Sequence, residues 1–134
     1  MTQEQRDLLL KDLCARLPYG VICKDDYAKV EGKLVQIGIN YDMCLLSDDY
    51  GKTEFAYIPN CKPYLFPLSS MTEEQHKEFY DKYCWNDGGD NFEMDSCSHY
   101  YALEKFDWLD KNHFDYRGLI PMGLANDATG LNIY

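Results

Sequence analysis

The chain has 134 residues, 46% of them hydrophobic and 15% aromatic, which excludes a disordered segment and suffices for one domain, residues 1–134, with its own core. The formal net charge is −10, so the surface repels the nucleic-acid backbone and anionic lipid, and we expect neither direct nucleic-acid binding nor membrane-surface binding. The partner that this charge favours is a protein with a basic surface.

The cysteines and the opening residues indicate a compartment. Six cysteines are present and none forms a Cys-x-x-Cys pair. Residues 2–5 are polar and lack the basic and then apolar run of a secretory leader, and no stretch has the roughly 18 apolar residues of a membrane helix. We therefore expect a cytoplasmic protein with reduced thiols, several of which act as small core hydrophobes.

The first predicted element is a helix over residues 3–17. Thr2 and Gln5 have the spacing of a capping box, in which each side chain bonds the other's backbone N–H. Leucines recur at every fourth position from Leu9, so one side of the helix is apolar. Pro18 ends the helix because it restricts the residue before it.

Residues 20–58 predict an antiparallel meander of three or four strands, because apolar runs alternate with turn-forming residues. In the longest run, alternation places Val35, Ile37 and Ile39 on one sheet face. The strand candidates are 20–23, 30–40, 43–46 and 53–58.

The second half of the chain predicts two more helices and an irregular tail. Prolines 59, 63 and 67 interrupt regular structure, and the apolar residues between them predict an extended segment across the core. A second capping-box pair predicts a helix over 72–83, and a third helix is expected over 98–111. Residues 113–134 are too apolar for a free tail and are expected to pack against the body. The fold class is thus α+β, a meander packed by about three helices.

Negative charge is concentrated in residues 72–95, which include eight acidic residues and two basic ones. Because no catalytic constellation accompanies them, they suggest a non-enzymatic interaction protein that offers an acidic face to a basic protein partner. As an alternative, carboxylates at phosphate-like intervals could mimic nucleic acid and block a host defence nuclease. The acidic residues are Glu73, Glu74, Glu78, Asp81, Asp87, Asp90, Glu93 and Asp95.

No residue pattern indicates a metal or a cofactor, and none is expected. The loop 87–95 offers carboxylates around two glycines, but it departs from the EF-hand order of ligands, so we expect a solvated loop. His76, His99 and His113 lack the spacing of a local zinc site. In the tail, Asp115, Arg117 and Asp127 could form a buried charge set, whose expected role is to tie an irregular segment to carboxylates or carbonyls.

Enzyme motifs are equally absent from the sequence: there is no glycine-rich phosphate loop, no nucleophile elbow and no local signature of a cysteine hydrolase. A further alternative is a small-ligand-binding domain or enzyme with an aromatic pocket between sheet and helices. Its lining would be Tyr41, Tyr57, Tyr64 and Trp108. The same rings could instead fill the core.

Two stretches have a distinctive sequence, KPYLFPLSSMTEEQ at 62–75 and NHFDYRGLIP at 112–121, the latter preceded by Trp108-Leu109 and followed by LNIY at 131–134. With residues 17–21 they resemble small uncharacterised proteins of gut Bacteroidales and their phages. The resemblance covers about half of the chain and leaves out the β region and the acidic loop. It carries no known activity and no catalytic residue, and it implies a phage or mobile-element accessory protein.

Overall fold

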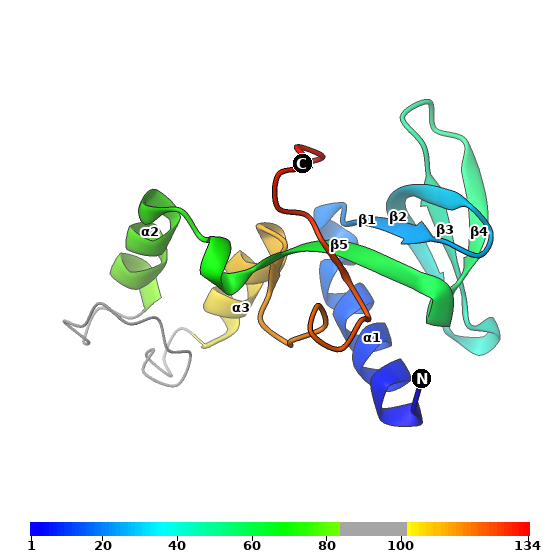
Figure 1. Cartoon of the computed structure of the whole chain (residues 1–134), viewed down its shortest axis with the longest axis horizontal. Coiled ribbons are helices and arrows are strands. Elements are labelled where there is room, and N and C mark those ends of the chain that lie inside the picture. The colour runs from blue at the N-terminus through cyan, green and yellow to red at the C-terminus, as the bar shows by residue number, and fades with distance from the viewer. Residues whose placement is uncertain (84–101) are drawn as a thin grey trace.

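The computed structural model describes residues 1–83 and 102–134, and within them the fold is α+β, as the sequence predicts (Figure 1). The helices are α1 (Gln3–Arg16), α2 (Glu73–Tyr83) and α3 (Ala102–Lys111). The strands are β1 (Ile22–Asp25), β2 (Val30–Gly38), β3 (Met43–Ser47), β4 (Thr53–Tyr57), β5 (Cys61–Pro67), β6 (Phe114–Asp115) and β7 (Asn126–Asp127).

The strands follow the order β4-β3-β2-β1-β5-β6, and β7 also pairs with β5. The pairs from β4 to β5 are antiparallel, which confirms the predicted meander, whereas β6 and β7 run parallel to β5. Figure 1 places the β3–β4 hairpin at one end of the molecule and α2 at the other, with α1 between them. Strand β4 is therefore the end strand of the sheet on the side away from α2 and α3.

Both predicted capping boxes are present. At the start of α1, the Gln5 N–H donates to Thr2 Oγ1 at 3.1 Å, and the Thr2 N–H donates to Gln5 Oε1 at 3.0 Å. Thr72 and Gln75 make the same pair of bonds before α2, at 3.1 and 2.9 Å. These bonds satisfy backbone donors that a helix start leaves free, which is why both starts can be read from the sequence.

Strand β2 corrects one prediction, because Val35 and Ile37 do not share an environment. Leu34 pairs with Leu46 and Gln36 pairs with Leu45, so Val35 is an extra residue in a β-bulge. Val35 is consequently 45% exposed, while Ile37 packs against the core. The strand ends at Gly38, and the next three residues form a 3-10 turn. Ile39, the third residue of the predicted face, therefore lies outside the strand.

The proline-rich segment is extended across the core, as predicted, but its prolines do not interrupt regular structure. Residues 61–67 form strand β5, in which Pro63 pairs with Cys23 of β1. A proline lacks the N–H donor, so it is tolerated in a strand only where that nitrogen points away from the neighbouring strand. Such positions cannot be recognised from sequence alone, and the prolines therefore suggested a break where the sheet continues.

The core consists of two clusters. The larger lies between α1 and the inner face of the sheet and includes Leu9, Leu13, Leu34, Leu46 and Leu65. The smaller lies where α2, α3 and β6 meet and contains four buried residues, Phe79, Trp108, Leu109 and Phe114. The tail contributes to the larger cluster through Leu119, Leu124 and Ala125, which confirms that it packs against the body.

The close approach of β2 and β3 leads to a prediction on stability. A Cβ at Gly32 would lie 2.3 Å from the Ser47 carbonyl oxygen, whereas one at Gly38 would lie 3.5 Å from the Met43 carbonyl oxygen. Backbone cannot yield as a flexible side chain does, so we expect Gly32→Ala to lower the free energy of unfolding by about 2 to 3 kcal/mol. Gly38→Ala should change it by less than about 1 kcal/mol. Urea denaturation measures both, and equal values would contradict the argument.

Candidate functional site

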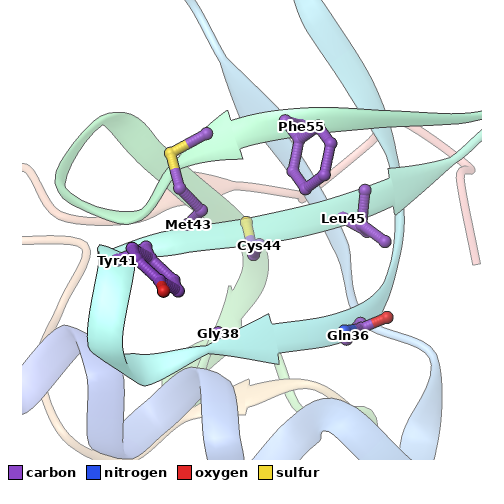
Figure 2. A pocket seen from close by; sticks show the side chains of 7 residues that line it. All are labelled: Gln36, Gly38, Tyr41, Met43, Cys44, Leu45 and Phe55. Atoms are coloured by element: carbon purple, nitrogen blue, oxygen red, sulfur yellow. The ribbon is translucent and has the colours of Figure 1, made fainter.

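An apolar hollow lies on the outer face of strands β2, β3 and β4 (Figure 2). Its volume is about 370 Å³. Leu45 on the middle strand, β3, lies directly opposite Gln36 of β2 on one side and Phe55 of β4 on the other. The residues that line it are Gln36, Gly38, Tyr41, Met43, Cys44, Leu45 and Phe55.

The hollow arises from strands that carry apolar residues on both faces. In β3, Cys44 and Leu46 point into the core, while Met43 and Leu45 are half-buried on the opposite face. Gly38, opposite Met43, has no side chain and leaves the space open. Most antiparallel sheets turn polar residues to the side that faces away from the core. An uncharged lining on this face is therefore the feature that needs an explanation.

Two aromatic rings at the hollow are largely exposed, Tyr41 by 81% and Phe55 by 67%. Tyr41 lies in the 3-10 turn that follows β2, and Phe55 lies on β4, so the rings border the hollow from two elements (Figure 2). Tyr57 shares the outward side of β4 with Phe55, and its hydroxyl accepts a hydrogen bond from Arg6 Nη2 at 3.1 Å. We call Tyr41, Met43, Leu45, Phe55 and Tyr57 the sheet face.

The four aromatic residues expected around a ligand pocket are not brought together. Tyr41 lines the hollow, whereas Trp108 is buried against Phe79 and Phe114 at the other end of the molecule. Tyr57 contacts Arg6, as described. Tyr64 lies on β5, where burial and a hydrogen bond to the Glu31 carboxylate raise its pKa to about 12.

Eight acidic residues were predicted to form an interaction face, and the four of them that the structure describes lie on α2. Glu73, Glu74 and Asp81 are exposed there. Glu78 instead accepts hydrogen bonds from Trp108 Nε1 and Lys82 Nζ, each at 3.3 Å, and these bonds lower its pKa. It thus links α2 to α3. Asp87, Asp90, Glu93 and Asp95 lie outside the described residues, as does His99.

A buried ion cluster ties α1 to α3 and the tail. Asp12 and Arg16 are fully buried, and Arg16 Nε donates to Asp12 Oδ2 at 2.9 Å. Arg16 Nη2 donates to the Phe114 carbonyl oxygen at 2.6 Å. Arg117 Nη1 donates to Asp12 Oδ1 at 2.8 Å and lies 3.6 Å from Asp110 Oδ1. Two arginines and two aspartates balance in charge, so the cluster fits a structural role.

The three charged tail residues that were predicted to form one set, Asp115, Arg117 and Asp127, have separate partners. Arg117 is the expected arginine fork, and its guanidinium also lies over the Tyr116 ring, 4.5 Å from the centroid. Asp115 does not join it but accepts two backbone N–H bonds, from Leu119 at 2.8 Å and Ile120 at 2.9 Å. Asp127 accepts from the Thr129 N–H at 2.9 Å, which lowers its pKa. The three residues therefore each stabilise the tail without forming one set.

Three of the cysteines confirm the expectation of small core hydrophobes. Cys23, Cys44 and Cys61 are buried and unbridged, and the sulfurs of Cys44 and Cys61 are 3.7 Å apart. Their mutual hydrogen bond, with burial, raises the pKa of the Cys44 thiol, which makes it a poor nucleophile. Within residues 1–83 and 102–134, no group of three histidine, cysteine or acidic side chains is arranged to hold a metal ion.

Comparison of the chain with protein-family models, with curated proteins and with solved structures finds no match. Function must therefore be argued from the site. In the part of the chain that the structure describes, none of the helices has the length and apolar character needed to cross a membrane.

The ion cluster leads to a prediction. Asp12→Asn removes the carboxylate shared by Arg16 and Arg117 and leaves buried positive charge uncompensated. We expect the free energy of unfolding to fall by about 3 to 5 kcal/mol in urea denaturation. Asp7→Asn, on the exposed side of the same helix, is the control and should change it by less than about 0.5 kcal/mol. Similar values for the two variants would show that the cluster contributes little.

His113 leads to a prediction on pH. Its ring stacks on Tyr134, with the centroids 3.7 Å apart, and burial, then the charge of Arg16, lowers its pKa from 6.5 to about 4. Between these values the unfolded chain binds a proton that the folded chain does not, so stability falls as pH falls. The expected loss from pH 7 to 4 is about 2 to 3 kcal/mol. Aspartate and glutamate side chains ordinarily titrate near pH 4 as well. The test therefore compares the pH dependence of the free energy of unfolding between the wild-type chain and a variant without His113.

The control for this prediction is His113→Asn. Residue 113 has φ of 63°, a left-handed conformation that asparagine tolerates well. The variant should lose most of the stability change between pH 6.5 and 5, measured by urea denaturation at each pH. An unchanged pH profile would contradict the assignment to His113.

Proposed function

We propose that this chain is a protein-interaction domain that binds its partner through the sheet face. The observation that carries the proposal is the exposure of Tyr41 and Phe55 around an uncharged hollow. Contiguous apolar surface on a water-exposed face costs solubility, and where it persists it commonly marks a contact with another molecule. Aromatic residues and methionine are also enriched in protein interfaces.

The shape of the hollow favours a protein partner over a small ligand. Small-molecule sites bury most of their ligand and present a few convergent polar groups. Here the hollow is open to one side, and Gln36 and the Tyr41 hydroxyl are its polar side-chain groups (Figure 2). A protein side chain that enters such a depression can bring its own neighbouring surface to cover the rings around it.

The charge of the chain supports a basic partner. The net charge is −10, and a partner of like sign would be repelled at long range, whereas a basic one is steered toward the surface. The uncharged sheet face can then supply the short-range contact. Two features thus support the proposal, the apolar contact surface and the negative net charge of the chain.

The test compares two substitutions of exposed aromatic residues. Phe55→Ser removes the ring that borders the hollow, and Tyr50→Ser removes a ring that is 95% exposed in the β3–β4 turn. Affinity capture from the source cell, with quantitative mass spectrometry, should identify a protein that the wild-type chain retains. We expect Phe55→Ser to reduce its recovery at least tenfold and Tyr50→Ser to leave it unchanged. Equal recovery with all three proteins would contradict the proposal.

A further inference from the structure

The outer edge of β4 is open along part of its length. The Asp48 N–H donates to the Lys52 carbonyl at 2.9 Å, and the Ile58 N–H donates to the Asp42 carbonyl at 2.7 Å. In an antiparallel pair, hydrogen-bonded positions alternate, so the even-numbered residues of β4 direct their backbone groups toward β3. The backbone groups of Thr53, Phe55 and Tyr57 therefore point away from β3.

Only one of these three outward N–H groups has an acceptor among the described residues. The Tyr57 N–H donates to the buried carboxylate of Asp25 at 3.3 Å. Strand β4 pairs with β3 alone among the described strands, and no described residue accepts from the N–H groups of Thr53 or Phe55. The open edge thus runs from the hairpin turn to Phe55 and stops at the position that Asp25 occupies.

From this edge we propose that the partner contributes an extended segment that pairs with residues 53–55 as an added strand. The inference rests on the proposed function and specifies its mode. Adding a strand to an exposed edge gives affinity through main-chain hydrogen bonds and specificity through alternate side chains. Phe55 lies at both the edge and the hollow, so an added strand would continue the sheet face.

Charge near the edge specifies the chemistry of the segment. Residues 40–58 contain four acidic side chains and one basic side chain, Lys52, which lies 3.8 Å from Glu54. Arg6 of α1 lies 3.2 Å from Asp42, so these six side chains together carry a net charge of −2. The acids are Asp42, Asp48, Asp49 and Glu54. A segment rich in lysine or arginine complements this charge, whereas an acidic or neutral one does not.

Alternation along β4 specifies where those charges belong. Phe55 projects to the outer face, and Glu54, its neighbour in the strand, projects to the opposite side with its side chain about half exposed. Residues opposite each other on paired strands share a face. The added segment therefore carries an apolar residue beside Phe55 and basic residues at the alternate positions beside Glu54.

A second copy of the chain fits this edge less well. Two copies that pair through β4 bring together two chains that each carry a net charge of −10. Like charges at an interface oppose association, so a basic segment from another protein is the occupant that the surface favours.

The experiment uses random twelve-residue peptides displayed on phage and selected on the complete chain. We expect the selected sequences to alternate lysine or arginine with valine, isoleucine, leucine or phenylalanine. One selected peptide is then synthesised with a fluorophore, and its binding to the chain is measured by anisotropy at low and at high salt. Affinity should fall as salt rises, because the basic side chains contact acidic ones.

Two substitutions at one position test the strand pairing. Thr53→Pro removes an outward N–H and leaves the bonds between β3 and β4 intact, while Thr53→Val keeps that N–H in a residue suited to strands. We expect Thr53→Pro to weaken peptide binding about tenfold or more and Thr53→Val to leave it within about twofold. Circular dichroism tests whether each variant folds.

A modified peptide repeats the test without changing the protein. N-methyl groups at one set of alternate peptide residues should abolish binding, and those at the other set should not, because only one set faces β4. Equal tolerance at both sets would overturn the strand pairing even if Thr53→Pro failed to fold.

The remaining outcomes separate the two proposals. Selected peptides that lose affinity with Phe55→Ser but not with Thr53→Pro would leave the protein-interaction proposal in place and overturn strand addition. Selected peptides without basic residues would overturn the charge assignment. Self-association of the wild-type chain that Thr53→Pro abolishes, measured by sedimentation, would show that a second copy occupies the edge. If no peptide is selected, the inference fails, while capture of a partner that depends on Phe55 would still support the proposed function.

Discussion

The structure depends on pairing the charge of one buried guanidinium, that of Arg16. Arg16 is fully buried at the end of α1, and an unpaired charge there would cost far more than the few kcal/mol by which a domain is stable. Its partners come from its own helix and from the first residue of β6, and Arg117 shares the same aspartate. The cluster therefore sets where residues 102–134 pack, with α1 held across the inner face of the sheet.

Among residues 1–83 and 102–134, that arrangement leaves the opposite side of the sheet uncovered. Helix α1 and the tail supply apolar residues to the inner face, while α2 and α3 form their own cluster away from β4. None of the described helices covers the outer face of β2–β4, although Leu45 and Phe55 point outward there. This apolar face is the feature on which the proposed interaction function rests.

Local interactions were predictable from the sequence, and distant ones were not. The capping boxes at Thr2 and Thr72 involve residues three positions apart, so the residue types alone indicate them. The bond from Arg16 to the Phe114 carbonyl spans 98 positions, and the one from Arg117 to Asp12 spans 105. Nothing in the local pattern shows which distant carboxylate an arginine will meet.

The candidate site shows the same division. Strand β4 was predicted, but the bulge at Val35 and the strand that contains Pro63 were not, because both depend on which backbone groups face a neighbouring strand. The hollow was missed for a related reason. Apolar residues on both faces of β3 can indicate a strand that is covered on both sides. Only the arrangement of the described helices shows that they leave its outer face uncovered.

The carboxylate of Asp25 has a consequence for solubility. It accepts the N–H groups of Tyr27 and Ala28 in the turn after β1 as well as that of Tyr57 in β4. One side chain thus shortens the unpaired edge to a stretch with two free donors. Long, flat edges template endless sheet growth into fibres, and short or charged ones resist it. The chain can thus expose a strand edge that is too short to template continuous strand addition.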